Sequence, residues 1–189
     1  MFPFTKVVIT CWLIFWLYWF IAASKSKRNA VPSNINRFFG VRIGLIVLAI
    51  VLFRFLNVQN YSFQNHIISH NVLVSISGLI VFLLGLALAI WARLYLGRNW
   101  GVPMTQKQDP ELVTSGPYRY IRHPIYAGIL LAVLGSAIAS SIFWLTILVI
   151  SGTYFIYSAV VEEKIMMEQF PKDYLAYKHK TKMLIPFVI

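Results

Sequence analysis

The chain has 189 residues, of which 59% are apolar and 12% are charged, and its mean hydropathy is +0.70. A soluble domain is about 45–50% apolar and about 25% charged, so this composition excludes an ordinary soluble domain and a disordered chain. Long unbroken apolar runs, in place of alternating apolar and polar residues, exclude a membrane β-barrel. The composition therefore predicts an all-α fold, a polytopic membrane helix bundle.

Five apolar stretches approach the length of about 20 residues that a helix needs to cross a bilayer. They lie at 5–23, 41–57, 72–96, 125–139 and 142–161. Only Ser140 and Ser141 separate the last two, which predicts two antiparallel helices joined by a tight turn. We expect one membrane domain over 1–189 with five transmembrane helices.

The distribution of Lys and Arg predicts the orientation of these helices. Fourteen of the 17 fall in three segments, at 25–42, 97–124 and 162–189, while 58–71 and 140–141 hold none. The basic side of a membrane protein is cytoplasmic, so we expect an outer N-terminus and a cytoplasmic C-terminus. The net charge of +11 then reflects topology and an affinity for anionic membrane lipids. Nucleic-acid binding is not expected, because no basic domain lies outside the membrane.

The segment 97–124 is long for a connector, and long loops are usually functional. Pro124 suits the first turn of the helix that follows, which puts His123 at its N-cap. The helix dipole disfavours a charged imidazole there, so we expect His123 to act as a neutral hydrogen-bonding group. The alternative is a histidine that only caps the helix at the membrane surface.

The segment 162–189 begins with two adjacent carboxylates, Glu162 and Glu163, directly after the fifth apolar stretch. Carboxylates at a membrane boundary are costly unless they face a polar cavity or a cation. Further on, apolar and aromatic residues recur every three or four positions, which predicts a cytoplasmic amphipathic helix on the membrane surface that could also close a site. That face is formed by Met166, Phe170, Tyr174 and Tyr177.

Four sequence elements together resemble a known family. The first is GPYRYIRHPIYAG at 116–128, the second is Glu162-Glu163, and an LGRNW element precedes both at 96–100. The third comprises Phe170, Tyr174, Tyr177, Thr181, Lys182, Leu184 and Pro186. Their order and spacing resemble the isoprenylcysteine carboxyl methyltransferase family, whose members are integral membrane enzymes. The resemblance covers about 96–189.

This resemblance implies S-adenosylmethionine as the methyl donor. The chain has no strand–GxGxxG–helix unit, so the donor would bind among the helices and the long loop rather than in a Rossmann domain. The glutamate pair would offset the positive charge of the donor, and His123 would hydrogen-bond its polar edge. The implied donor-binding residues are Tyr118, Arg122, His123, Pro124, Tyr126, Glu162, Glu163, Tyr174 and Tyr177. No metal is expected, since the single Cys11 cannot form a cysteine zinc site.

The acceptor is expected to be lipid-like, with a prenylated cysteine carboxylate as one candidate. Arg93, near the inner end of the third stretch, could anchor it and serve with Glu163 as a catalytic residue; alternatively Arg93 snorkels to the membrane interface. The family pattern has arginine at the positions of Ser158 and Lys182, and lysine cannot form a bidentate fork with a carboxylate. We therefore expect weak recognition of a prenylcysteine carboxylate.

Two other classes compete with a membrane methyltransferase. A sterol-reductase-type enzyme carries a similar R-H-x-x-Y element, but NADPH would require a cluster of arginines for its 2′-phosphate. A non-enzymatic membrane scaffold or transporter is the other alternative. A transporter needs ionisable groups near the midplane of the bilayer, whereas here they gather at the inner face.

Overall fold

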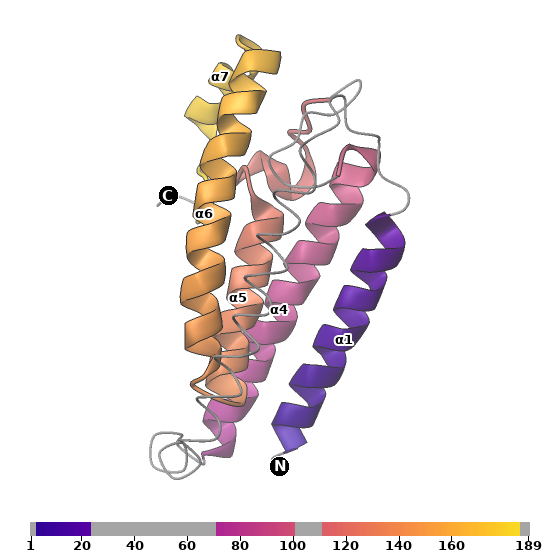
Figure 1. The fold of residues 1–189 in the computed structure, drawn as a ribbon, viewed down its shortest axis with the longest axis vertical. Helices are drawn as coiled ribbons and strands as arrows, with labels where there is room; N and C mark the ends of the chain where they lie inside the picture. The colour runs from indigo at the N-terminus through magenta and orange to yellow at the C-terminus, as the bar shows by residue number, and fades with distance from the viewer. Residues whose placement is uncertain (1–2, 24–70, 101–110, 186–189) are drawn as a thin grey trace, which may run out of the picture.

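A computed structural model describes residues 3–23, 71–100 and 111–185. These residues form helices and no strand. The elements are α1 (Pro3–Ala23), α4 (Val72–Leu96), α5 (Pro124–Ala139), α6 (Trp144–Gln169), α7 (Asp173–Lys180) and two 3-10 turns, η1 (Gly97–Asn99) and η2 (Gly116–Arg119). In Figure 1 the four long helices form a bundle, with α4 and α5 between α1 and α6 and with α7 folded back at the end of α6.

The helices follow the apolar stretches closely. The predicted stretches at 72–96 and 125–139 agree with α4 and α5 to within one residue, and 5–23 lies inside α1. The stretch at 41–57 lies outside the described residues. The cap of α4 explains its start, because the Asn71 side chain accepts a hydrogen bond from the backbone N–H of Leu73 at 2.9 Å.

The helix that contains most of the fifth apolar stretch, predicted at 142–161, is longer than that stretch. The helix α6 continues to Gln169, through both glutamates. Apolar character ends at Val161, but the Glu, Lys, Met and Gln residues that follow favour helix as strongly as Leu does. The two carboxylates therefore stand on a rigid helix that extends beyond its apolar part.

The number of membrane crossings stays a prediction. Among the described helices, α4 and α6 are each long and apolar enough to cross a membrane, while the apolar part of α1, Phe4–Trp19, and α5 are shorter. Large side chains on the outer faces of the bundle, such as Leu13, Leu73 and Val149, are mostly exposed. An exposed apolar surface of this extent suits lipid rather than water.

Small residues bring α4 and α5 very close together. Gly85 and Ala89 of α4 face Gly128 and Ala132 of α5. A Cβ added to Gly128 would lie 2.6 Å from the backbone nitrogen of Ala89, so only glycine permits this separation. Glycine-lined seams are a common way for membrane helices to pack without polar contacts. The seam fixes α5 against α4 and thereby fixes the position of His123 at the start of α5.

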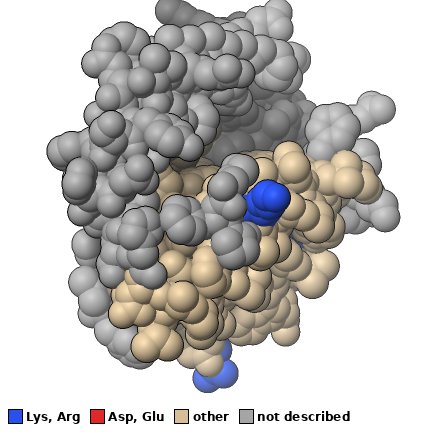
Figure 2. All heavy atoms as spheres, turned by 90° about the horizontal axis from the view of Figure 1, so that it is seen from below, with Lys and Arg blue, Asp and Glu red and all other residues tan. Residues whose placement is uncertain are grey.

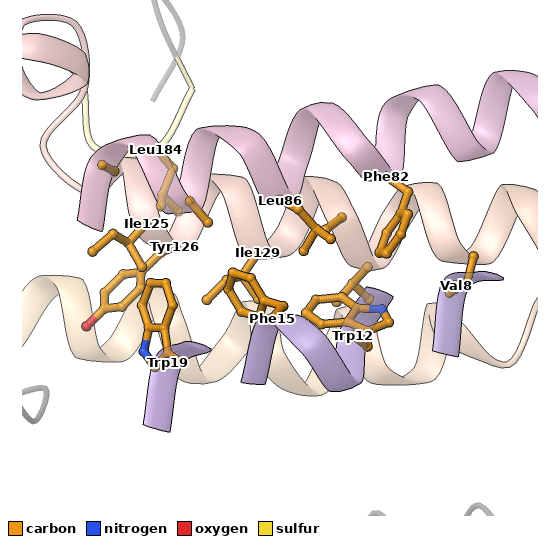
Figure 3. Close-up of a cluster of buried hydrophobic side chains, with 14 of the residues drawn as sticks. Val8, Trp12, Phe15, Trp19, Phe82, Leu86, Ile125, Tyr126, Ile129 and Leu184 are labelled. Atoms are coloured by element: carbon orange, nitrogen blue, oxygen red, sulfur yellow. The ribbon is translucent and has the colours of Figure 1, made fainter. Parts of the chain in front are cut away.

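The helix α1 covers this pair with aromatic side chains (Figure 3). Its buried residues, spaced three or four apart, are Val8, Trp12, Phe15 and Trp19. The indole N–H of Trp12 donates to the Ser136 hydroxyl on α5 at 3.1 Å, and its ring stacks on Trp144 of α6 with centroids 5.9 Å apart. A single residue of α1 thus contacts two other helices.

The continuous amphipathic helix predicted after Glu163 is wrong. The chain leaves helical geometry between Gln169 and Asp173, where Pro171 lacks the N–H that a helix interior needs and clashes with the preceding turn. Of the predicted face, Met166 lies on α6, Phe170 in the break, and Tyr174 and Tyr177 on the short helix α7. The break lets α7 fold back toward α5.

The two ends of the bundle differ in charge. Seen from the end that carries the α5–α6 turn, Figure 2 shows no described acidic residue and few basic ones. All of the acidic residues that the structure describes lie toward the other end of the bundle. They are Glu111, Glu162, Glu163, Glu168 and Asp173. In the part of the chain that the structure describes, carboxylates are therefore found only at the end formed by η2, α7 and the tips of α4, α5 and α6.

Candidate functional site

The start of α5 is joined to the C-terminal segment. His123 is the N-cap of α5 and Pro124 occupies its first turn, as predicted. The backbone N–H of Arg122 donates to the carbonyl of Lys182 at 2.8 Å, and that of His123 donates to the carbonyl of Met183 at 3.0 Å. The His123 side chain makes no capping bond, so its ring is available for other contacts.

Glu163 is the centre of a buried ion cluster. Its Oε1 accepts from Arg122 Nε at 2.7 Å, and its Oε2 lies 2.8 Å from Lys178 Nζ. Burial alone would raise the pKa of this carboxyl, but His123, Lys178 and Arg122 together outweigh burial and hold it at about 2. Both oxygens of Glu163 are thus occupied by cations of the protein.

Glu162 has a different environment from its neighbour. Its Oε1 accepts from the Tyr126 hydroxyl at 2.6 Å, and its Oε2 lies 3.6 Å from His123 Nδ1. Its side chain is 25% exposed, against 4% for Glu163. Glu162 is therefore the carboxylate of the pair that a ligand could reach.

The ring of His123 is held between aromatic and acidic groups. It stacks on Tyr126 with centroids 5.4 Å apart and an angle of 2°, and Tyr126 in turn stacks on Phe155. His123 Nε2 lies 3.7 Å from Glu163 Oε1, too far for a hydrogen bond, and this buried atom has no hydrogen-bond partner among the residues that the structure describes. A buried polar atom without a hydrogen bond lowers the stability of the folded protein unless a ligand or a water molecule bonds to it.

The predicted tyrosines hold the loop and the C-terminal helix together. The Tyr177 hydroxyl donates to the carbonyl of Tyr118 at 2.6 Å. The side chain of Tyr174, which also lies on α7, is buried. Burial, followed by the effects of Tyr177 and Glu162, raises the pKa of the Tyr118 hydroxyl, and Arg93 opposes that shift. Burial also raises the pKa of Tyr177 to about 12, although Arg122 acts in the opposite direction. All these phenols are neutral donors near pH 7.

Arg93 lies apart from this cluster. Its Nη1 donates to the carbonyl of Gly97 at 2.6 Å, its Nη2 donates to the carbonyl of Ala22 at 2.9 Å, and its guanidinium lies over the Trp100 ring at 4.6 Å. The side chain is buried, so it does not snorkel into solvent. Its contacts join α1, α4 and η1. Its only effect on the site is electrostatic, because its positive charge opposes the rise that burial causes in the pKa of the Tyr118 hydroxyl.

Two contributors were missed at the level of sequence. Lys178 is a partner of Glu163, and the Thr181 carbonyl accepts a hydrogen bond from Arg122 Nη1. Lys178 looks like any lysine of a basic tail, and no periodicity assigns it to a carboxylate fifteen residues earlier. Ser158 is a third polar group near the site, since it lies one helical turn before Glu162 and its hydroxyl is fully buried without a partner.

The arrangement can bind a ligand that carries both a cation and hydrogen-bonding groups. Glu162 supplies negative charge, His123 Nε2 supplies an unused hydrogen-bonding position, and Tyr126 and Phe155 supply stacked rings. Glu163, Arg122 and Lys178 keep these groups in place. Among the described residues no cluster of His, Cys, Asp and Glu has the form of a metal site.

Known proteins are similar to this chain in sequence. The protein-S-isoprenylcysteine O-methyltransferase of Xenopus laevis is 31% identical over 61% of this chain and 41% of its own length. The cobalt-zinc-cadmium resistance protein CzcN of Cupriavidus metallidurans is 30% identical over 55% of this chain and 47% of its own length. A second protein-S-isoprenylcysteine O-methyltransferase, from Arabidopsis thaliana, is 27% identical over 61% of this chain and 60% of its own. The chain thus spans about half the length of the curated relatives it matches.

The fold also matches a solved structure. The eukaryotic intramembrane Ras methyltransferase, an isoprenylcysteine carboxyl methyltransferase, superimposes with a TM-score of 0.58 over 84% of this chain and 55% of that one, at 24% identity. This likeness concerns the fold alone. The family described as phospholipid methyltransferase matches residues 73–173, a segment of more than half the chain that includes His123, Glu162 and Glu163. The chain therefore belongs to the phospholipid methyltransferase family.

Proposed function

We propose that this chain is an integral membrane methyltransferase that transfers a methyl group from S-adenosylmethionine to an amphiphilic, lipid-like acceptor. One observation carries the proposal: within the segment that matches the family, His123 presents a buried, unpartnered Nε2 beside the reachable carboxylate of Glu162. The outer N-terminus and cytoplasmic site predicted from the charge distribution are part of the same proposal.

The residues present fit S-adenosylmethionine, which carries a sulfonium, an ammonium and a carboxylate. Glu162 would face its positive charge, and the unpartnered Nε2 of His123 would bind a polar group. Tyr118, Tyr126, Tyr174 and Tyr177 would shape the walls. Glu163 contacts Arg122 and Lys178 through both oxygens, so its proposed role is to hold the segment that carries His123.

The donor supplies an electrophilic methyl group, and the residues of this chain supply position and field. Glu162 would orient the positive charge of the donor beside the first turn of α5. The stacked rings of Tyr126 and Phe155 would exclude water from one side of the donor. An acceptor that is already ionised, such as a carboxylate or thiolate, needs no general base. Catalysis by this site would then come from alignment of the two reactants and from removal of water.

The contacts of the arginines bear on the acceptor. A carboxylate is normally bound by an arginine fork. Arg122 uses Nε for Glu163 and Nη1 for backbone carbonyls, and Arg93 uses Nη1 and Nη2 for the carbonyls of Gly97 and Ala22, so neither guanidinium keeps the two free nitrogens that a fork needs. We infer that a prenylcysteine carboxylate is a poor acceptor and that an amphiphile of other chemistry is preferred.

The test is transfer of a labelled methyl group from S-adenosylmethionine to extracted lipids and prenylated thiols by the purified protein. Glu162→Gln should abolish most of the transfer, and it should weaken donor binding measured by calorimetry. Glu168→Gln, an exposed glutamate on the same helix, is the matched control and should leave both unchanged. Equal behaviour of the two variants would reject Glu162 as a binding residue.

A second titration separates the proposed methyltransferase from the reductase. The purified protein should bind S-adenosylmethionine and should show no saturable binding of NADPH. Saturable binding of NADPH without binding of S-adenosylmethionine would reject methyl transfer and favour the sterol-reductase-type alternative.

A further inference from the structure

A cavity that is open to the surface lies beside the ion cluster. It has a volume of about 460 Å³ and is formed by the end of α6, the helix α7, the segment after it and Arg122. It is lined by Arg122, Met167, Leu175, Lys178, His179, Thr181, Lys182 and Met183. Neither His123 nor Glu162 lines it, so it is distinct from the proposed donor site.

The charge of this cavity favours an anion. Its lining holds three permanent cations and a histidine, and no acidic residue. One carboxylate, Glu163, serves two of these cations, Arg122 and Lys178. Lys182 is exposed and pairs with no carboxylate in the part of the chain that the structure describes. The cavity therefore keeps an excess of positive charge.

Arg122 also provides an unused donor. Its side chain is only 8% exposed, Nε and Nη1 are bonded within the protein, and Nη2 makes no hydrogen bond to any described residue although Arg122 lines the cavity. A guanidinium held in this way by its other nitrogens is a preorganised donor for a phosphate oxygen.

The apolar part of the lining indicates what accompanies the anion. Met167 and Leu175 are exposed and Met183 is half-buried, so three apolar side chains accompany the basic ones in the lining. Met167 lies six residues beyond Val161, where the apolar part of α6 ends, and so about 9 Å further along the axis at 1.5 Å per residue. In a helix that crosses the bilayer with its apolar part in the hydrocarbon core, that height lies at the outer edge of the headgroup layer, which is about 5–7.5 Å thick on each side.

From these features we infer that the cavity binds the phosphate of an anionic membrane lipid, with its acyl chains toward the apolar side chains of the lining. Arg122 Nη2, Lys182 and His179 contact the phosphate, and Met167 and Leu175 contact the lipid. Because Arg122 and Lys178 belong to both sites, an occupied cavity would hold the cluster around Glu163 more rigidly. This site does not depend on methyl transfer, and its test measures binding alone.

The test is native mass spectrometry of the detergent-released protein titrated with a short-chain phosphatidylglycerol, a short-chain phosphatidylcholine and inorganic phosphate. We expect phosphatidylglycerol to bind at least tenfold more tightly than either of the others. Lys182→Gln should weaken that binding at least fivefold. Lys180→Gln, an exposed lysine of α7 that does not line the cavity, should change it less than twofold.

Each other outcome overturns the assignment. Equal affinity for phosphatidylglycerol and phosphatidylcholine would exclude recognition of the anion. Equal affinity for inorganic phosphate would make the cavity a site for free phosphate and not for lipid. Equal losses in the Lys182→Gln and Lys180→Gln variants would show that diffuse surface charge accounts for binding. Thermal unfolding of both variants checks that the fold is retained.

Discussion

The seam between α4 and α5 and the cluster at the head of α5 are held together in opposite ways. The seam has no ionised side chain and depends on the absence of side-chain atoms at positions such as Gly85 and Gly128. The cluster, only a few residues away along α5, depends on a carboxylate with two cations and on backbone pairing with the C-terminal segment.

The seam therefore makes the bundle rigid, whereas the cluster carries the charged groups. The seam tolerates no added volume but does not respond to pH or salt. The cluster responds to any change of charge, because a buried carboxylate without its partners is costly. Four predictions test this comparison.

The largest effect is expected from Glu163→Gln. The amide keeps the shape but leaves Arg122 and Lys178 without their anion, and breaking a buried pair costs about 3 kcal/mol or more. Chemical unfolding in detergent, followed by tryptophan fluorescence, measures this loss. Glu168→Gln, on the exposed part of the same helix, should be neutral. A neutral Glu163→Gln would mean that the cluster contributes little to stability.

A smaller loss is expected in the seam, from Gly128→Ala. The new Cβ would lie 2.6 Å from the Ala89 backbone nitrogen, and overpacking of this kind costs about 2 kcal/mol. Gly152→Ala adds the same methyl group to α6, where only a Leu130 methyl lies nearby at 3.9 Å, and it should stabilise slightly through helix propensity. Similar thermal unfolding of both variants would contradict a tight seam.

The next prediction concerns Arg93, which lies beyond both regions and contacts backbone carbonyls. We expect Arg93→Lys to lower kcat/KM with any accepted amphiphile by less than about tenfold, or roughly 1.4 kcal/mol, because its role is to join α1, α4 and η1. A panel of lipid carboxylates, thiols, phenols and amines gives the measurement. A larger loss confined to carboxylates would identify Arg93 as an acceptor anchor.

The last prediction concerns the pH dependence of the Glu163 contribution to stability. The carboxyl of Glu163 has a pKa of about 2 in the folded protein, below its usual value near 4.5. Its stabilising contribution is therefore complete above about pH 4.5 and is lost as the pH falls toward 2. The stability difference between the wild-type protein and Glu163→Gln should shrink over that window. A difference that stays constant down to pH 2 would show that the carboxyl is not ionised in the cluster.

Much of the bundle could be predicted from the sequence. Apolar stretches located α4 and α5 to within one residue, and the position of Pro124 identified His123 as an N-cap. The end of α6 and the break before α7 were not found, because hydropathy detects the apolar part of a helix and not its polar continuation. Pro171 was visible in the sequence as the reason for the break.

By itself the sequence determined the class of fold, the family and the residues that gather at one end of the bundle, because apolar length, proline and motif spacing are local properties. The tertiary structure alone decided how those residues divide their roles. Glu162 and Glu163 are adjacent and chemically identical, yet one contacts Tyr126 and solvent and the other contacts Arg122 and Lys178. Their difference comes from partners 36, 41 and 15 residues away, and only packing brings those partners together.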